Sequence, residues 1–352
     1  MIQITFSIII PVFNTSQYLE QCLESIITQQ EKNLEIICID DNSKDNSLEV
    51  LYKYKNIDSR IKIIKFNKNL GAGICRNTAI NIAKGKYICF VDSDDIIEKN
   101  LLSECSKLIN INPDIIIFGA KTLNYNTQKI KSGQYCSRFF PKEYFNSNIF
   151  KYHTVSWNKL YKTEFLIKNN IKFDSTFESE DQIFTIKSLL LAENINILKK
   201  DLYIYRKNRP DATTSSKYRN NTSCITVTYN IESLLNDLNI PKDLKNKILG
   251  YYILKSISHL AKTDRIFSDV YLTELESLLK FMKKLKGRFW WDYYKLPNNK
   301  CYLNLKLNYI KAQLKYILHE KLIILPAFLL FFLHVILEQI NKGESYVYKD
   351  KQ

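Results

Sequence analysis

Residues 87–95 read YICFVDSDD, an apolar run that ends in three carboxylates within four positions. A short, uninterrupted apolar run of this kind is typical of a strand buried on both faces. Apolar runs that end in polar residues occur twice upstream, where residues 6–14 read FSIIIPVFN and residues 34–43 read LEIICIDDNS, and they predict strands at 6–12 and 34–40. Because the carboxyl ends of parallel strands share one edge of a sheet, the polar residues after these three runs are expected to meet there.

Helix-like segments separate the strand-like runs. Apolar residues at positions 19, 23, 26 and 27 lie on one face of a predicted amphipathic helix over 16–30. The remaining predicted elements, in chain order, are a helix at 43–54, a strand at 61–66, a helix at 73–84 and strands at 86–92 and 114–120. This alternation predicts an α/β fold with a mostly parallel sheet and helices on both faces. Residues 121–150 are irregular and aromatic-rich, which indicates hairpin or loop structure.

From about residue 220 onward, apolar residues recur at helical spacing, few turn signals occur and the chain becomes basic. We therefore expect a first domain at 1–219 and a basic, mainly helical region at 220–352. The net charge is +15, and residues 217–321 hold 19 Lys and Arg against 9 Asp and Glu. Such an excess favours anionic partners such as nucleic acid, phospholipid head groups or phosphorylated substrates, although a solvated lysine-rich surface explains it equally well.

The most apolar segment is 322–337, interrupted by Pro326 and His334. Its 16 residues fall short of the roughly 20 that a membrane-spanning helix needs. Lys311, Lys315 and Lys321 precede it, and a basic stretch leading into a short apolar one is typical of an in-plane membrane anchor. A helix packed on the protein's own surface or in a dimer interface is the alternative.

The eight cysteines are scattered, with no CxxC pair and no histidine close by. This pattern argues against a zinc site and a disulfide framework and indicates a reducing compartment. The N-terminal residues lack the basic region and cleavage site of a signal peptide, so a cytoplasmic location is expected.

Two acidic clusters follow predicted strands. Asp92, Asp94 and Asp95 repel one another unless a cation lies among them, and carboxylate oxygens select a hard ion such as Mg²⁺ or Mn²⁺. A solvated turn with Asp95 as helix N-cap is the alternative. Asp41 could accept hydrogen bonds from a ribose or a base N–H, or residues 42–43 could cap the following helix.

Residues 69–77 read NLGAGICRN, in which two glycines permit close backbone approach and Arg76 could meet a phosphate or a base. The pattern is not GxGxxG, and no acidic residue follows at the dinucleotide spacing. A nicotinamide-binding site is therefore disfavoured.

In order and spacing, these motifs resemble those of family 2 glycosyltransferases of the Rossmann-like GT-A fold, of the bacterial type that builds surface polysaccharides. The resemblance covers residues 5–210 and rests on four motifs in sequence, which are more specific together than any one alone. It implies the following sites: a nucleotide-sugar site at Pro11, Phe13, Asn14, Asp41, Arg76, Asp92 and Arg206, and a Mn²⁺ or Mg²⁺ site at Asp94 and Asp92, with Asp95 supporting the metal shell.

Two further segments carry the resemblance downstream. Residues 157–161 (WNKLY) resemble the segment that precedes the acceptor side, and residues 203–216 resemble a strand and flexible loop over the donor. Glu180 and Asp181 resemble the family's acidic pair at a helix start, where the aspartate is the catalytic base. Helix N-terminal charge complementing the macrodipole is the alternative for this pair.

The resemblance implies an inverting transfer of a sugar from a nucleotide-diphosphate donor, by family habit a UDP-sugar, to a hydroxyl of a glycan or lipid-linked glycan. Such an enzyme would lie on the inner face of the cytoplasmic membrane, held by anionic lipids. A nucleic-acid-binding protein fits the charge, but it leaves acidic groups at three strand ends unexplained, so no nucleic-acid partner is expected. A nucleotide-sugar-binding protein without turnover and a nucleotidyltransferase of related fold stay open.

Overall fold

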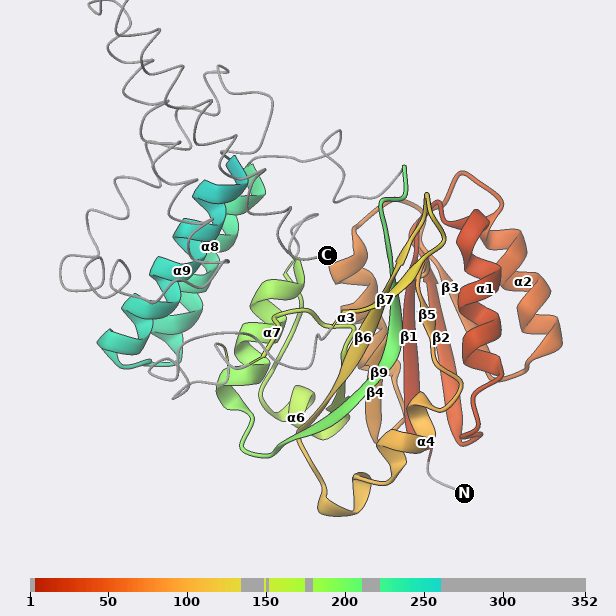
Figure 1. Ribbon diagram of the computed structural model, residues 1–352, viewed down its shortest axis with the longest axis horizontal. Helices are drawn as coiled ribbons and strands as arrows, with labels where there is room; N and C mark the ends of the chain where they lie inside the picture. The colour runs from red at the N-terminus through yellow and green to blue at the C-terminus, as the bar shows by residue number, and fades with distance from the viewer. Residues whose placement is uncertain (1–3, 134–148, 150–151, 175–179, 211–221, 261–352) are drawn as a thin grey trace, which may run out of the picture. The chain divides into compact units, whose positions relative to one another are not determined.

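The computed structural model describes residues 4–133, 149, 152–174, 180–210 and 222–260, and Figure 1 shows the remainder as a grey trace. The chain separates into two compact units, Met1–Arg219 and Asn220–Gln352. The apolar segment 322–337 and the lysines before it lie outside the described residues, as does most of the loop predicted after Arg206.

A nine-stranded sheet forms the centre of the first unit. The strands are β1 (Phe6–Val12), β2 (Leu34–Asp40), β3 (Ile61–Lys65), β4 (Tyr87–Phe90), β5 (Ile96–Ile97), β6 (Ile115–Asn124), β7 (Ile130–Ser132), β8 (Lys159–Lys162) and β9 (Ile195–Lys207). Their order is β3-β2-β1-β4-β8-β6-β9-β5, with β7 pairing on β6. The first four strands in this order are mutually parallel, with Phe6 opposite Leu34 on one side and Tyr87 on the other. The predicted α/β fold with a mostly parallel sheet is confirmed.

Helices cover both faces of this sheet (Figure 1). They are α1 (Ser16–Ile27), α2 (Ser47–Ile57), α3 (Ala72–Ile82), α4 (Leu101–Ser106), the 3₁₀ turn η1 (Ile109–Ile111), α6 (Thr163–Lys168) and α7 (Glu180–Leu191). The helix predicted at 43–54 starts four residues later than expected. Asn42 takes a left-handed φ of 62°, and both Asp45 carboxylate oxygens accept backbone N–H groups, from Ser47 and Ser16. These contacts hold residues 42–46 as a loop.

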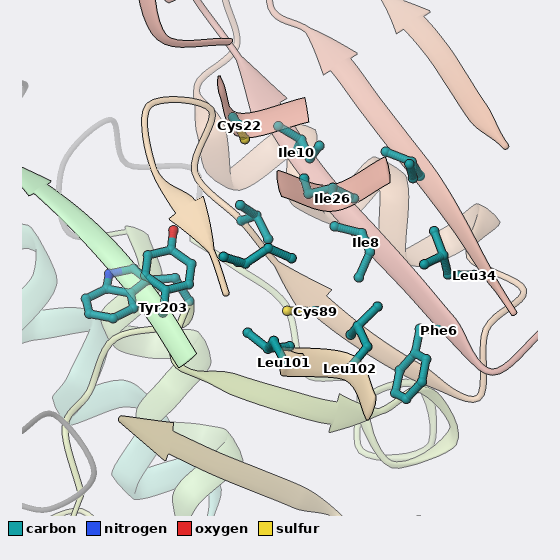
Figure 2. Packing of buried hydrophobic residues seen from close by; sticks show 14 of the residues in the cluster. Phe6, Ile8, Ile10, Cys22, Ile26, Leu34, Cys89, Leu101, Leu102 and Tyr203 are labelled. Carbon is teal, nitrogen blue, oxygen red and sulfur yellow. The ribbon is translucent and has the colours of Figure 1, made fainter. Parts of the chain in front are cut away.

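Alternate residues of the central strands build two apolar layers. Phe6, Ile8 and Ile10 of β1 pack with Cys89 of β4 against α1 and α4, as Figure 2 shows, and Leu51 and Tyr54 of α2 belong to the same cluster. The intervening residues of β1 and β2 face α3, and Phe90 of β4 contacts Phe184 of α7. Both faces of β1, β2 and β4 are therefore buried, which explains why these strands are continuous apolar runs rather than alternating ones.

Beyond β4 the sheet contains both antiparallel and parallel pairs of strands. Strand β8 runs antiparallel between β4 and β6, and β9 pairs parallel to β6 and antiparallel to β5. The contact of β9 with β5 brings the end of a 13-residue strand next to the loop that follows β4.

The second unit is described as two helices, α8 (Thr222–Asp237) and α9 (Lys242–Leu260), which pack on each other. Their buried residues include Ile231, Leu235, Ile248 and Leu249. Within the described residues, no helix combines the length and apolar character that crossing a membrane requires.

Candidate active site

Hydrogen bonds join the loops after β1, β2 and β4 at one edge of the sheet. The Thr15 N–H donates to Ser47 Oγ, and the Thr15 hydroxyl donates to Ser93 Oγ, each over 3.0 Å. The Asn14 N–H donates to Ser43 Oγ over 3.1 Å. The segment after β1 therefore contacts both other loops, and polar residues from three separate stretches of sequence lie together.

Asp41 holds the glycine-containing loop before α3. Its Oδ1 accepts the N–H of Leu70 over 2.7 Å, and its Oδ2 accepts the N–H of Gly71 over 2.8 Å. Gly71 has a φ of 89°, a conformation that favours glycine. Asp41 thus shapes the loop, and its contact with a nucleotide base stays a prediction.

Phe13, Pro11 and Asn14 differ in how accessible they are. Phe13 is 43% exposed, so its ring is open to stacking. Pro11 is buried within β1. Asn14 takes a left-handed φ of 50°, and its side-chain oxygen accepts the Lys44 N–H over 2.7 Å. Of these three predicted nucleotide contacts, Phe13 and Asn14 are exposed and Pro11 is buried.

Asp40 is a candidate that sequence reasoning missed. It is fully buried, and its Oδ1 has no hydrogen-bond partner among the described residues, although its Oδ2 accepts the Ser43 N–H over 3.4 Å. The side-chain oxygen of Asn69 is likewise buried and unpartnered within that part of the chain. Buried oxygens without donors are unfavourable and need an explanation, such as a ligand N–H. The Asp-Asp pair of the motif was the available signal.

Arg76 joins two carboxylates from distant parts of the chain. Its Nη2 lies 2.6 Å from Asp92 Oδ1 and its Nη1 lies 2.6 Å from Glu180 Oε1. The Arg76 side chain is 5% exposed. The structure therefore brings Arg76, Asp92 and Glu180 together. The sequence predicts that Arg76 contacts a base or diphosphate, and in the structure its guanidinium pairs with these two carboxylates.

Asp94 forms an ion pair that the sequence did not suggest. Arg209 Nε lies 2.6 Å from Asp94 Oδ2, and both side chains are 13% exposed. Burial raises the pKa of the Asp94 carboxyl above its ordinary value, with Arg209 opposing the shift and Asp92 adding to it. A cation beside Asp94 is thus favourable, as metal binding there would require.

Asp95 accepts two hydrogen bonds from strand β9. It is fully buried, its Oδ2 accepts the Tyr203 hydroxyl over 2.8 Å, and its Oδ1 accepts the Arg206 N–H over 2.7 Å. Tyr203 Oη also accepts the Asp92 N–H over 3.1 Å. Burial and the charges of Asp94 and Asp92 raise the pKa of Asp95 well above its ordinary value. These contacts hold the acidic loop, residues 92–95, in place. The predicted role of Asp95 in supporting a metal shell stays a prediction.

Arg206 holds the backbone of the acidic loop. Its Nε donates to the Asp94 carbonyl over 2.8 Å and its Nη2 donates to Gln21 Oε1 over 2.8 Å. The guanidinium lies 5.0 Å from the ring centroid of Tyr18, and the residue is 6% exposed. Arg209, 5.7 Å from the same ring, pairs with the Asp94 carboxylate itself. Sequence reasoning selected Arg206 and missed Arg209.

Glu180 and Asp181 are the first two residues of α7. Asp181 lies close enough to Arg76 for its charge to raise the pKa of the guanidinium, after the larger contributions of Asp92 and Glu180. Glu180 is thus paired with the same arginine as Asp92, and Asp181 lies next to Glu180 at the start of α7. Its catalytic role stays a prediction.

Lys159 of the WNKLY segment has a structural role. Its side chain is fully buried, and Nζ donates to the carbonyls of His153 and Val155, each over 2.7 Å, and to Asn158 Oδ1 over 2.6 Å. The preceding Trp157 stacks on Tyr203 at 4.7 Å. This segment supports the strand that carries the Asp95 partner.

Among the described residues, no group of three or more His, Cys, Asp or Glu side chains is arranged to hold a metal ion. Five described cysteines, at positions 22, 38, 75, 89 and 105, are free and buried. The carboxylates of Asp92, Glu180, Asp94 and Asp95 are each paired with an arginine side chain or a backbone N–H.

The sequence model of Glycosyl transferase family 2 matches residues 7–169, which include most of β1, the acidic loop after β4 and strand β8. This part of the first unit is a glycosyl transferase family 2 sequence. The fold agrees, since the crystal structure of Staphylococcus aureus TarS residues 1–349 in complex with UDP-GlcNAc matches with a TM-score of 0.63 at 23% identity, covering 89% of each chain.

Two curated glycosyltransferases resemble the family 2 unit in sequence. Glycosyltransferase GlyA of Streptococcus pneumoniae is 34% identical over 212 residues, which are 57% of this chain and 30% of GlyA. The poly(ribitol-phosphate) beta-N-acetylglucosaminyltransferase TarS of Staphylococcus aureus is 32% identical over 218 residues, 60% of this chain and 37% of TarS. The chain thus spans well under half the length of either relative.

Proposed function

We propose that this chain transfers a sugar from a UDP-sugar to a hydroxyl of a glycan or lipid-linked glycan, with inversion at the anomeric carbon, in the synthesis of a bacterial surface polysaccharide. The observation that carries the proposal is that Arg76 joins Asp92, which follows β4, to Glu180, which begins α7. This contact supports a single site for the carboxylates that the family resemblance assigns to the donor and acceptor sides.

The residues have distinct parts in this reaction. Phe13 stacks on the base, and Asp41 or Asp40 accepts a base N–H. Asp181 removes the proton of the acceptor hydroxyl as its oxygen bonds to the anomeric carbon. The bond between that carbon and the diphosphate oxygen breaks on the opposite face, and UDP leaves. One carboxylate base without a covalent intermediate gives inversion.

Asp94 and Asp92 would hold a Mn²⁺ or Mg²⁺ ion. Both ions accept one or two protein carboxylates and complete their shells with water and substrate phosphate, so two aspartates suffice. The raised pKa of Asp94 fits a carboxylate that is stabilised by added positive charge. When bound, the ion neutralises charge that develops on the leaving diphosphate.

The test is a transfer assay on the full chain with Mn²⁺, offering UDP-GlcNAc and then other UDP-sugars and GDP-mannose. Transfer with release of UDP is expected, and Asp181→Asn should lower kcat by about 10²–10⁴-fold with little change in donor affinity. Donor binding without turnover would indicate a binding protein, and pyrophosphate release a nucleotidyltransferase. Retention on DNA or RNA that falls with salt would favour a nucleic-acid-binding protein instead.

We also propose that the basic region at 220–352 attaches the chain to the inner face of the cytoplasmic membrane. The lysine excess in this region supports attraction to anionic lipid. In flotation with the full chain, binding to phosphatidylglycerol vesicles and not to phosphatidylcholine vesicles is expected. Failure to float with the anionic vesicles contradicts the membrane attachment and leaves the proposed sugar transfer unaffected.

A further inference from the structure

Four aromatic side chains join strands of the sheet to helix α7. Phe184 of α7 stacks on Phe173 at 4.0 Å and meets Phe90 of β4 edge-on at 5.5 Å. Tyr161 of β8 meets Phe184 edge-on at 5.0 Å, and its ring centroid lies 5.8 Å from that of Phe90. We call Phe90, Tyr161, Phe173 and Phe184 the aromatic cluster. The helix that begins with the proposed base therefore packs on β4 and β8 through these rings.

The Tyr161 hydroxyl is the one polar side-chain group of the aromatic cluster. The residue is fully buried, and its hydroxyl oxygen has no hydrogen-bond partner among the described residues. A buried hydroxyl without a partner destabilises a fold, and phenylalanine would fill the same space without this cost. Packing alone therefore does not explain why position 161 carries a hydroxyl.

Asp181 lies on the side of α7 that Tyr161 contacts. Asp181 and Phe184 are spaced i and i+3, so their side chains share one face of the helix. Because helical side chains lean toward the helix N-terminus, the Phe184 ring and the phenol that it contacts lie beside the first turn. Burial raises the pKa of the Tyr161 hydroxyl well above its ordinary value, and Asp181 adds to the shift more than any other charge. Geometry and charge thus indicate the same carboxylate.

The start of α7 is also joined to the donor side of the site. Glu180, the neighbour of Asp181, pairs with Arg76 of α3 over 2.6 Å, and Arg76 pairs with Asp92 over the same distance. The Arg76 guanidinium lies 5.1 Å from the ring centroid of Phe173, so it contacts the aromatic cluster as well. A ligand that binds at Asp92 or Arg76 therefore acts on the first turn of α7.

We propose that Tyr161 is a positioning residue, whose hydroxyl donates a hydrogen bond to the Asp181 carboxylate and orients it when the nucleotide is bound. The proposal rests on the proposed function, in which Asp181 removes the proton of the acceptor hydroxyl. One carboxylate oxygen accepts the Tyr161 O–H and the other accepts the acceptor O–H, for which a carboxylate has enough lone pairs. Since packing already fixes the phenol ring, the donor is in place before the substrate arrives.

The test compares Tyr161→Phe with the wild-type full chain in the transfer assay. We expect kcat to fall by about 10–10²-fold and the Kd for UDP to stay within about threefold of wild type, because orientation of the base acts on the chemical step. The acid limb of the kcat–pH profile, which reports the base in the enzyme–substrate complex, should shift by about 1 pH unit to higher pH. The reason is that a carboxylate that loses a hydrogen-bond donor holds its proton more tightly.

Tyr87→Phe is the matched control, since Tyr87 is also fully buried and its hydroxyl donates to the Pro113 carbonyl over 3.1 Å. This control should lose stability in urea denaturation and keep the wild-type kcat and pH profile. Tyr161→Phe should do the reverse, with a denaturation midpoint equal to or above that of wild type. An unchanged kcat, or a kcat that falls only in step with a loss of stability, overturns the proposal.

A double-mutant cycle identifies the partner of the hydroxyl. In an Asp181→Asn background, Tyr161→Phe should lower kcat no further, because the carboxylate that it orients is already absent. Equal fold-losses in the two backgrounds would show that the hydroxyl acts on another group.

Carbon-13 NMR of the Asp181 carboxyl, in the complex with UDP and Mg²⁺, gives a readout that does not depend on turnover. Its titration should move to higher pH in Tyr161→Phe than in wild type, and identical titrations refute the hydrogen bond. Absence of transfer by the wild type with every donor would refute the proposed function, and the NMR titration would still decide the hydrogen bond.

Discussion

Arg209 Nε lies 2.6 Å from Oδ2 of Asp94, the carboxylate that we propose as a metal ligand. Both side chains are 13% exposed, and the Arg209 guanidinium lies 5.7 Å from the ring centroid of Tyr18. A divalent cation that binds Asp94 therefore meets a resident positive charge, which competes for the same oxygen and repels the ion. Removal of that charge should favour the metal.

Arg209→Gln should bind Mn²⁺ more tightly than wild type in the absence of nucleotide. The expected improvement is up to about tenfold, equivalent to about 1.4 kcal/mol, because one competing charge is lost. Calorimetric titration of the full chain with Mn²⁺ measures it. Lys53→Gln, which removes the exposed ion pair with Glu20, is the control and should change nothing. Equal or weaker Mn²⁺ binding by Arg209→Gln would contradict the competition.

Tyr203→Phe should lower the free energy of unfolding by about 1–3 kcal/mol, because the Asp95 carboxylate and the Asp92 N–H each lose a buried partner. Urea denaturation at pH 7 measures the change. Tyr161→Phe is the matched control, since the Tyr161 hydroxyl is buried with no hydrogen-bond partner among the described residues. That control should be neutral or stabilising, and equal losses in both variants would argue against a special role for the Tyr203 hydroxyl.

Glu35 should stabilise the fold in a pH-dependent way. Burial alone would raise the pKa of this carboxyl, but hydrogen bonds from Lys62, Ser7 and the Lys84 N–H outweigh it, and the pKa is lowered from 4.5. The folded pKa thus lies below the unfolded one, so the stabilisation is complete above about pH 4.5 and is lost as pH falls through the folded pKa.

The variant Glu35→Gln isolates this contribution. Urea denaturation at pH 7, 5 and 3 should show a deficit relative to wild type that is equal at pH 7 and 5 and smaller at pH 3. Glu31→Gln, on a partly exposed side chain, serves as the control. A deficit that grows on acidification would reverse the sign and rule out a lowered pKa.

Lys159→Met should destabilise the first unit by about 2–4 kcal/mol, since two carbonyl oxygens and the Asn158 side chain lose a buried charged donor. Lys168→Met, at an exposed position in α6, should have little effect on stability. Thermal or urea denaturation distinguishes the two variants. A small effect at position 159 would mean that water or a neighbouring group replaces the ammonium.

Local patterns predicted much of the parallel half of the fold. The run at 6–12 and the run at 34–40 are strands with the predicted bounds, because apolar residues buried on both faces leave a continuous signal in the sequence. The predicted start of α2 was four residues too early. Asp45 accepts the N–H groups of Ser16 and Ser47, and Ser16 belongs to α1, so this contact has no local signal in the sequence. The position of β8 between β4 and β6 has no local signal, since strand order depends on long-range pairing.

The sequence by itself determined the family and the residue types of the site, because each motif lies within a few consecutive positions. The tertiary structure decided which charges meet. Arg76 and Glu180 are 104 positions apart, and Arg206 bonds to Asp94 across 112 positions, so neither contact can be read from spacing. A carboxylate takes whichever donor the folded chain brings within hydrogen-bond distance, and that is fixed by strand order and helix packing rather than by the motif that contains it.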